Sequence, residues 1–540
     1  MIYTRVKASF LYGFFGCMVL LFSCQTSSQN EQKSLDGNST SVLRINIGED
    51  PTTIDPCYAR NLPAITLVKM LFEGLTRIGL DGKVEKGLAE SIDISDDYTR
   101  YTFTLKEAVW SNGDPITADD LIYAWKRVLN PKNHSANAFH LYPIKNAKAV
   151  WQGIKGEEEL GIHKLDDKTF SVELEEMVPY FLELVAYPAY FPIHAGLDRE
   201  NPDWAKEHKA LVTSGPFMLK EWRSQNVIRV QKSPSYWEKE KVQLDEISMY
   251  MVAEHTELSL FENGDIDWAG SPLSTLPLDA LKRLSAKKVV HRRPIMATYF
   301  LRLNTRDPLL SSPKMRRAIS WSLNRKELTE NVLINSQVPA TGFIPDFFQI
   351  REESYFKDED VQAAVKMLSE DLEERGLRRL ALAKIELAFP VNERNQRIAQ
   401  TIQARLKQTL GIEIALGPLE SKIYFDKLYK GDFQMIMGSW FADYNDPLAF
   451  LEIFKTKEGG ANYTQWESEE YRAFLEKAKH TVDSKERLQQ LALSEKILID
   501  ESPIIPLFHY NLSFIKNEKL ENVAISDLGI CDFRWAEMKR

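Results

Sequence analysis

The chain has 540 residues, 44% of them hydrophobic, and this length predicts two or three folded lobes instead of one domain. Charged residues make up 27%, as in an ordinary soluble protein. The net charge of −9 is mild for this length. It argues against a nucleic-acid partner, which would need clustered Lys and Arg side chains.

The N-terminal segment is typical of a secretory signal peptide over residues 1–23. Arg5 and Lys7 precede an apolar run at 8–22, which is shorter than the roughly 20 residues that span a bilayer. Residues 21–24 resemble a bacterial lipobox, which implies cleavage before Cys24 and lipidation of its thiol. A plain signal peptide with an incidental cysteine is the alternative. Residues 24–40 are rich in Ser, Asn and Gln and predict a flexible tether.

Two cysteines, Cys57 and Cys531, belong to the segment that follows the tether. An oxidising compartment permits a disulfide between them, and two buried free thiols agree equally well with the sequence. The sequence has no Cys-x-x-Cys motif, so we expect no structural zinc site.

The first third of the chain carries clear patterns of secondary structure. Alternating apolar residues predict strands at 43–47, 101–105 and 170–174. Helical spacing over 65–75 predicts a helix that ends at Gly74. Thr117 and Asp120 predict a capping box before another helix at 121–128.

The region 380–440 shows a different pattern. A strand is predicted at 385–389, a helix from Ile398 to Leu410 that ends at Gly411, and strands at 412–416 and 433–440. Strand, helix, strand is the signature of an α/β fold with parallel pairing. Another amphipathic helix is predicted at 315–323.

Common catalytic motifs are missing from the sequence. It has no Gly-rich phosphate loop with Gly-Lys-Ser/Thr, no Gly-x-Ser-x-Gly elbow and no His-Glu-x-x-His motif. The nine His are scattered without ligand spacing. We therefore expect no enzyme, no metal and no cofactor. A glycosidase needs only two carboxylates, so an exported hydrolase of cell-wall material stays an alternative.

Eight phrases of the chain, in the same order, resemble the bacterial extracellular solute-binding proteins of the oligopeptide and dipeptide class. They are residues 50–56, 71–75, 101–120, 214–217, 233–237, 264–267, 314–325 and 440–447. The resemblance implies a periplasmic binding protein-like α/β fold of type II, with two lobes around a ligand cleft and an additional third domain. Domain I would take 41–62, 191–295 and 511–540, domain II 63–190, and domain III 296–510. Hinges would lie at 297–303 and 508–510.

The same resemblance implies a function. The chain would be the extracytoplasmic substrate-binding component of an ABC importer, and would capture short peptides in a closing cleft. Its partners would be short peptides, an inner-membrane ABC permease and the lipid bilayer through acylated Cys24. We expect an exported, membrane-anchored monomer that faces the periplasm or the cell exterior.

The resemblance also implies site residues. Asp443 matches the family aspartate that binds the peptide ammonium. Burial of that ammonium without a partner would cost several kcal/mol. Gly438 and Ser439 would lend backbone groups to an extended peptide, by strand addition. Further wall residues are implied with less support from the motifs. They are Trp440 and Phe441, for which core packing is the alternative, and Asp50 and Thr52 on the opposite wall. His140, Phe508, His509 and Tyr510 are weaker candidates, for which core packing is the favoured alternative.

The sequence departs from the better-known oligopeptide binders at the carboxylate end of the ligand. Met437 and Leu428 stand where those proteins have arginines, Ser421 replaces a tryptophan, and Asn395 replaces a histidine. We infer that ligand length or type has shifted, and a cell-wall peptide without a free C-terminal carboxylate would fit. Lys422, Lys427, Lys430, Arg394 or Arg397 could replace the missing cations, although a solvated surface side chain is the favoured alternative for each.

Three rival functions stay open on the sequence. The same scaffold could bind a nickel chelate, haem, an opine, a sugar or a cell-wall fragment instead of a peptide. The second rival is the exported hydrolase named above. The third is an adhesin that keeps the fold but has no transport partner.

Overall fold

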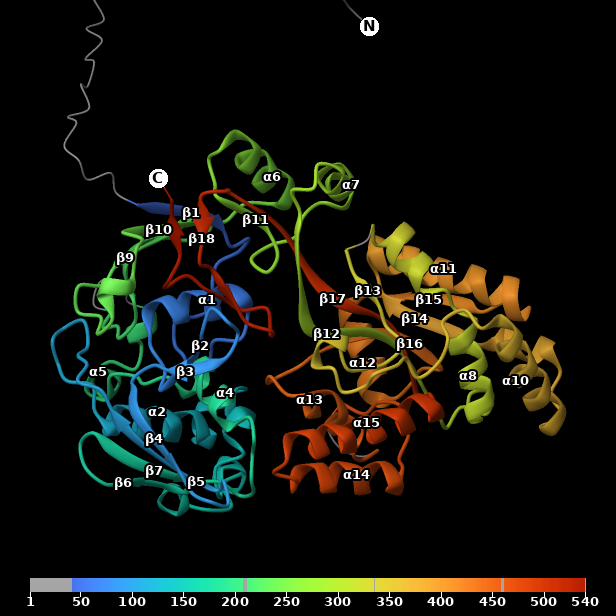
Figure 1. Ribbon diagram of the computed structural model, residues 1–540, viewed down its shortest axis with the longest axis horizontal. Coiled ribbons are helices and arrows are strands. Elements are labelled where there is room, and N and C mark those ends of the chain that lie inside the picture. Colours follow the sequence, from blue (N-terminus) through green and yellow to red (C-terminus); the bar gives the residue numbers. More distant parts are fainter. Residues whose placement is uncertain (1–40, 207–210, 335, 458–460, 540) are drawn as a thin grey trace, which may run out of the picture. The chain divides into compact units, whose positions relative to one another are not determined.

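The computed structural model describes residues 41–206, 211–334, 336–457 and 461–539 (Figure 1). The predicted signal peptide, Cys24 and the tether lie outside these residues. Residues 40–540 form one compact unit, and the predicted division into three domains stays a prediction. No helix among the described residues is long and apolar enough to cross a membrane.

An eleven-stranded mixed sheet dominates the described part of the chain (Figure 1). Its order is β15-β14-β16-β12-β17-β11-β1-β10-β9-β8, with β13 paired to β17. The strands are β1 (Val42–Asn46), β8 (Phe217–Arg223), β9 (Val227–Lys232), β10 (Glu246–Tyr250), β11 (Trp268–Gly270), β12 (His291–Leu303), β13 (Val338–Pro339), β14 (Glu386–Pro390), β15 (Ala415–Leu419), β16 (Met435–Phe441) and β17 (Ile504–Lys516). The predicted hinge segments lie within β12 and β17, which pair antiparallel.

The predicted βαβ unit is confirmed at one end of this sheet. β14 pairs parallel with both β15 and β16, and α11 (Glu393–Leu410) connects β14 to β15. Gly411 ends α11 with a φ of +63°, a left-handed conformation that glycine adopts without strain. The strand predicted at 412–416 was placed too early, because β15 begins only at Ala415.

A separate antiparallel sheet has the order β4-β5-β7-β6. Its strands are β4 (Ala89–Ile94), β5 (Arg100–Leu105), β6 (Ile162–Lys164) and β7 (Thr169–Glu173), while β2 (Thr76–Ile78) pairs with β3 (Val84–Lys86). The capping box of α2 (Ala118–Leu129) is confirmed, since the Asp120 carboxylate accepts the Thr117 N–H at 3.0 Å. Trp125 of α2 packs edge-on against Phe170 of β7, with ring centroids 5.6 Å apart.

Helix α1 (Leu62–Leu71) starts and stops earlier than its apolar pattern predicted. The Asn61 side chain caps its start by accepting the Ala64 N–H at 3.2 Å. Its end is set from elsewhere in the chain, because the Leu71 carbonyl accepts the N–H groups of Ser214 and Gly215 at 3.1 and 2.9 Å. The local sequence pattern cannot predict a helix end that is set by hydrogen bonds from a distant segment.

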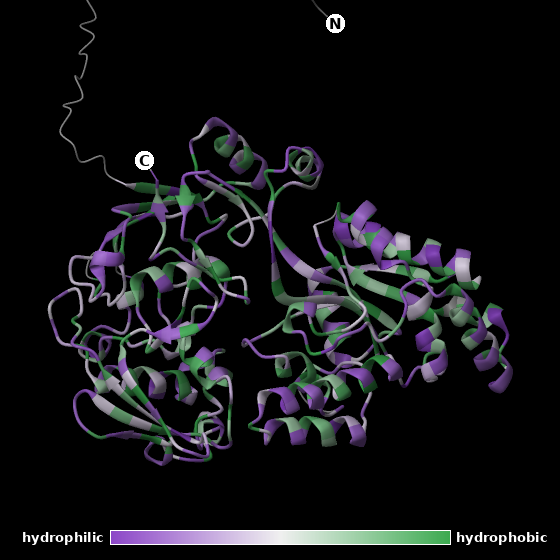
Figure 2. Ribbon diagram, in the orientation of Figure 1, coloured by the Kyte–Doolittle hydropathy of each residue, from purple (hydrophilic) through white to green (hydrophobic). Residues whose placement is uncertain are grey.

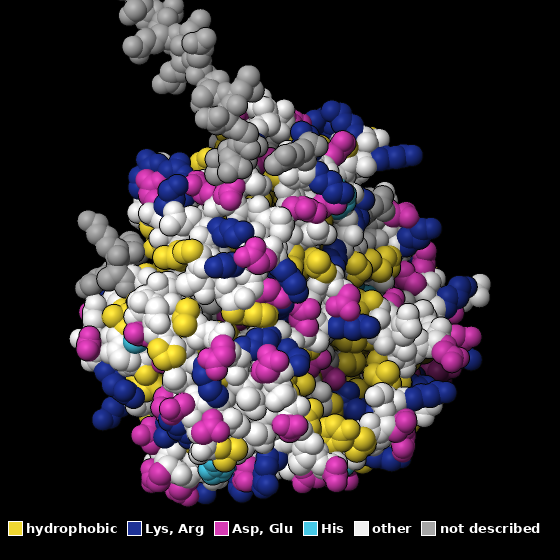
Figure 3. All heavy atoms as spheres, turned by 60° about the vertical axis from the view of Figure 1, so that its left-hand side comes forward, with side chains coloured by type: hydrophobic (Ala, Val, Ile, Leu, Met, Phe, Trp, Pro, Cys, Tyr) yellow, Lys and Arg dark blue, Asp and Glu magenta, His cyan; other side chains and the backbone are white. Residues whose placement is uncertain are grey.

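Further helices and short strands belong to the described part of the chain. They are α3 (Ala147–Trp151), α4 (Phe181–Val185), α5 (Ala195–Glu200), α6 (Glu254–Asn263), α7 (Leu278–Ala286), α8 (Pro313–Ser322), α9 (Arg325–Glu327), α10 (Val361–Glu374), α12 (Ser421–Lys430), α13 (Leu448–Leu451), α14 (Glu469–Lys479), α15 (Ser484–Glu501), β18 (Leu520–Glu521), β19 (Ala524–Ile525), β20 (Cys531–Asp532) and β21 (Glu537–Met538). Helices α10, α14 and α15 alternate hydrophobic and hydrophilic residues, as helices with one buried face do (Figure 2). On the face in Figure 3, cationic and anionic side chains are intermixed.

The end of the sheet that contains β16 separates two cores. Leu301 and Leu387 pack with Ile398 of α11 on one face. Phe300 packs with Phe450 of α13 on the other face. Because side chains alternate along a strand, neighbouring residues of β12 and β16 face different surroundings.

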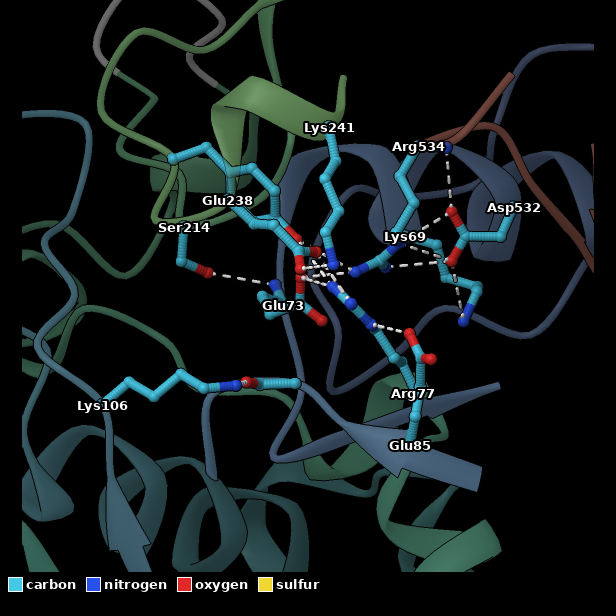
Figure 4. A network of polar contacts seen from close by, with 12 residues as sticks. Lys69, Glu73, Arg77, Glu85, Lys106, Ser214, Glu238, Lys241, Asp532 and Arg534 are labelled. Carbon is cyan, nitrogen blue, oxygen red and sulfur yellow. Dashed lines mark hydrogen bonds and ion pairs between the residues drawn. The ribbon is translucent and has the colours of Figure 1, made fainter. Parts of the chain in front are cut away.

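A buried network of charges ties α1 to the C-terminal segment (Figure 4). The Glu73 carboxylate, fully buried, contacts the Arg534 guanidinium directly and lies 3.8 Å from Arg77. Arg534 also pairs with Asp532 at 2.9 Å, and Asp532 lies 3.6 Å from the Lys69 ammonium. Burial of so many charges is tolerable only because each has an opposite partner.

Cys57 and Cys531 are both buried and both free, so the open question of their pairing is settled in favour of two thiols. Burial raises the pKa of Cys57 to about 12, assisted by the nearby Asp55 carboxylate. The pKa of Cys531 is raised further by the same cause. Both therefore behave as inert core groups.

Candidate ligand-binding site

A cavity of about 500 Å³ opens where the β16–α13 loop approaches α1. Its volume falls within the range of small-molecule and peptide sites. Predicted site residues that line it are Asp443, Phe441, His140 and Tyr510. Lining residues that the sequence patterns did not predict include Arg60, Phe139, Tyr187 and Gln337. These four lie in four different segments, and no local signal marks them.

Asp443 is the group with the most unusual surroundings in this cavity. Its side chain is half-buried, and no hydrogen bond or ion pair reaches its carboxylate from the part of the chain that the structure describes. Burial raises the pKa of Asp443 to about 6, and the Arg60 charge partly opposes the rise. Asp443 also lines a second, smaller cavity beside Tyr444 and Lys69. An unpaired, half-buried carboxylate of this kind is suited to bind a cation.

The neighbours of Asp443 in the loop are held firmly. The Asp446 carboxylate binds the Arg487 guanidinium through two hydrogen bonds of 2.8 Å and accepts the Leu448 N–H at 2.8 Å. Tyr444 stacks on Tyr180 with ring centroids 3.9 Å apart. The loop is therefore pinned on its C-terminal side, while Asp443 stays available.

Aromatic rings form a wall of the cavity near Asp443. The His140 imidazole lies between Phe139 and Tyr187, with ring centroids 4.0 and 4.2 Å away. Burial lowers the pKa of His140 to about 3, and the Arg60 charge adds to the effect. His140 is therefore neutral near pH 7 and adds no charge to the cavity.

Phe441 and Tyr510 form another wall, with ring centroids 5.1 Å apart. The Phe441 side chain is 52% exposed, which is unusual for a phenylalanine at the end of a central strand. The Tyr510 side chain is hydrogen-bonded to Ser439. This wall offers apolar surface to a ligand side chain.

β16 has one partly open edge beside this wall. β12 pairs with it from Met435 to Phe441, but within the described residues β14 pairs with it only at Met435 and Ile436. Ser439 therefore lies where β16 has one strand neighbour. Gly438 is fixed by packing, since a Cβ there would lie 2.3 Å from Nη1 of buried Arg302. An extended ligand could add to this edge.

Asp50 and Thr52 are not among the described residues that line the Asp443 cavity. Asp50 accepts hydrogen bonds from Ser224 Oγ at 2.6 Å and from the Gln225 N–H at 2.7 Å. Burial acts to raise the pKa of Asp50, but these hydrogen bonds outweigh it and the pKa is lowered. Thr52 donates to Asn61 at 3.2 Å and lines a different cavity.

Trp440, Phe508 and His509 are likewise outside the described lining of the Asp443 cavity. The Trp440 indole N–H donates to the Ala449 carbonyl at 2.8 Å. His509 is buried, with Nδ1 2.8 Å from the Thr298 hydroxyl, and burial lowers its pKa to about 3. Strand alternation explains the outcome for Trp440, since Phe441 and Trp440 point to opposite faces of β16.

A mixed α/β architecture and a cavity of this size, lined by a few polar groups, are typical of proteins that bind small solutes. Residues 83–462 match the model of the bacterial extracellular solute-binding proteins, family 5. The chain belongs to this family, and its fold is that of the type II periplasmic binding proteins. Members of the family are extracytoplasmic substrate-binding proteins.

Similar proteins support the assignment over nearly the whole chain. The oligopeptide-binding protein OppA of Bacillus subtilis is 37% identical over 95% of both chains. The open, unliganded form of the murein tripeptide-binding protein MppA has a TM-score of 0.80 at 27% identity, and the match covers 93% of this chain and 98% of that one. Haemophilus influenzae OppA in complex with the peptide RPPGFSPFR has a TM-score of 0.74 at 25% identity, over 93% and 100% of the chains.

Proposed function

We propose that this chain is the substrate-binding component of an ABC importer and captures short peptides in the cavity that Asp443 lines. The unpaired carboxylate of Asp443 is the observation that carries the proposal. A free peptide brings an ammonium group, which needs a carboxylate once it leaves water. The partly open edge of β16 supplies backbone groups that suit peptides of many sequences.

Identification of the natural ligand is the first experiment. A form that begins at Gln25 contains the whole compact unit of residues 40–540. Native mass spectrometry of this form, purified from cells, would be followed by denaturing release and sequencing of the bound molecules. We expect a ladder of peptides two to five residues long. A single non-peptide solute would leave the binding role in place but overturn the peptide assignment.

Asp443 provides the second test of the peptide assignment. Asp443→Ala should cost about 3–5 kcal/mol of peptide binding, because it strands a buried ammonium, and this equals roughly two to four decades in affinity. Titration calorimetry of both forms with the released peptides measures the difference. Unchanged affinity would remove Asp443 from the site.

We also propose that the chain is exported, lipidated at Cys24 and monomeric. The basic and apolar residues before Cys24 support this proposal. Metabolic labelling with a clickable fatty acid should label the wild type and leave a Cys24→Ala variant unlabelled. Equal labelling of both would contradict lipidation at Cys24, and sedimentation velocity of the Gln25 form tests the monomer.

Absence of catalysis belongs to the same proposal. Family members are substrate-binding proteins, and peptides recovered from the cavity should therefore be intact. Incubation of the protein with the recovered ligands, followed by mass spectrometry, checks this expectation. Turnover that tracks the protein concentration would favour the exported hydrolase instead.

A further inference from the structure

One of the cations that line the cavity, like Asp443, forms no hydrogen bond or ion pair with any described residue. Arg394 is half-buried in the first turn of α11. No hydrogen bond or ion pair joins its guanidinium to any described residue. Its backbone is well fixed, because the Asn392 side chain caps the helix through the Asn395 N–H at 2.8 Å. A fixed helix thus presents a free guanidinium at the cavity.

The other cations considered from the sequence are not among the described residues that line this cavity. Arg397 pairs with Glu393 at 2.5 Å, and Lys430 pairs with Asp426 at 2.8 Å. Lys427 lines a different cavity. Lys422 is exposed and is not among the described residues that line the Asp443 cavity. Of the five candidates, Arg394 alone shares a cavity with Asp443.

Arg394 and Arg60 act on different parts of the cavity. Arg394 and Tyr510 line the same cavity, and the Arg394 charge opposes the rise that burial causes in the pKa of Tyr510. The Arg60 charge acts instead on Asp443 and on His140. A ligand carboxylate beside Arg60 would therefore lie next to the Asp443 carboxylate and be repelled by it.

We propose that Arg394 binds a carboxylate of the same ligand whose ammonium Asp443 binds. The cavity then selects dipolar peptides with a free acid end. A guanidinium suits this role because it binds a carboxylate through two parallel hydrogen bonds. The inference rests on the proposed function. It revises the expectation that the ligand lacks a free carboxylate, which was drawn from Met437 in β16 and Leu428 in α12. The cation that binds the carboxylate comes from α11 instead.

The test uses random-sequence peptide pools of two to five residues, each as an equimolar mixture of free acids and C-terminal amides. The Gln25 form, freed of bound molecules, is incubated with each pool, and the ratio of bound acid to bound amide is measured after release. Wild type should enrich the acid by about tenfold or more at the preferred length. Arg394→Gln should bring the ratio close to one while it still binds the amides.

Two matched variants serve as controls. Arg397→Gln lies one turn further along α11 and should keep the wild-type ratio. Arg60→Gln should change the binding of acids and amides by the same factor, because it acts at the ammonium end. The ratio of bound acid to bound amide is measured within one sample. A partly unfolded variant therefore still gives this ratio, because unfolding lowers the binding of both peptides equally.

Each outcome bears on the inference. A wild-type ratio in Arg394→Gln overturns it and leaves peptide binding intact. A ratio that collapses in Arg60→Gln but not in Arg394→Gln assigns the carboxylate to Arg60 and also overturns it. If wild type binds neither acids nor amides, the proposed function fails together with the inference, and this result is distinct from the other two.

Discussion

The Arg487 guanidinium holds the Asp446 carboxylate through two parallel hydrogen bonds of 2.8 Å, and both side chains are buried. Arg487 comes from α15, and Asp446 lies three positions after Asp443. The pair therefore holds the loop between β16 and α13 in place, while no described residue forms a hydrogen bond or ion pair with the Asp443 carboxylate.

Removal of one member of this pair should destabilise the protein strongly. Arg487→Ala leaves a buried carboxylate without its partner, and we expect a loss of about 3–5 kcal/mol in the free energy of unfolding. Urea denaturation measures the loss. Arg472→Ala, which removes an exposed pair with Glu467, should cost less than about 1 kcal/mol. Similar losses for the two variants would show that the buried pair contributes little.

Peptide affinity should depend on pH through Asp443. Its pKa is raised to about 6, and only the ionised carboxylate attracts an ammonium. Affinity should therefore be constant near pH 7–7.5 and fall about tenfold by pH 5, as Asp443 takes up a proton. His140, with a pKa lowered to about 3, does not titrate in this range. Asp443→Asn should bind weakly with no such slope, and a slope in that variant would point to another group.

The unliganded protein should be more stable without the Asp443 charge. A folded-state pKa of about 6 lies above the unfolded value of about 3.9, so stability is lost as pH rises through 4–6. Asp443→Asn should therefore raise the free energy of unfolding at pH 7 by about 1–3 kcal/mol. Denaturation of ligand-free samples at pH 4 and pH 7 measures this difference, which should vanish at pH 4. A destabilised variant at pH 7 would contradict the raised pKa.

Gly438 should tolerate no side chain. An added Cβ would lie 2.3 Å from Nη1 of Arg302 and 2.8 Å from the Tyr424 hydroxyl, and both groups are buried. We expect Gly438→Ala to cost about 1–3 kcal/mol of stability. Gly196→Ala, in the exposed first turn of α5, should cost less than about 1 kcal/mol, because its Cβ would lie 3.3 Å from the His194 ring alone. Full stability of the Gly438 variant would mean that Arg302 moves freely.

The buried thiols should not react in the folded protein. Cys57 has a pKa raised to about 12, and Cys531 is fully buried. Iodoacetamide at pH 8 should therefore modify both only at the rate of unfolding. Mass spectrometry follows the reaction over time. Rapid modification of either residue in native conditions would show that its site opens locally.

The sequence allowed much of the fold to be predicted, because the βαβ unit and the capping box are local patterns. Boundaries were missed where a distant segment decides them, as Ser214 and Gly215 do at the end of α1. The same limit applies to the cavity. Asp443 stands in a recognisable phrase, whereas Arg60 and Tyr187 come from segments whose approach depends on the whole fold.

The network of Figure 4 has a consequence for the order of folding. Glu73, which follows α1, and Arg534 are 461 positions apart, and Lys69 of α1 pairs with Asp532, so this end of α1 gains these buried partners only after residues 532–534 have been made. β1 likewise forms its sheet pairings only after β10 and β11 have been made, because these two strands are its neighbours. Such distant pairings form late and slowly. A chain that is exported, as we propose here, would thus not complete its folding until nearly all of it has been made. An incompletely folded chain passes more readily through a narrow translocation channel.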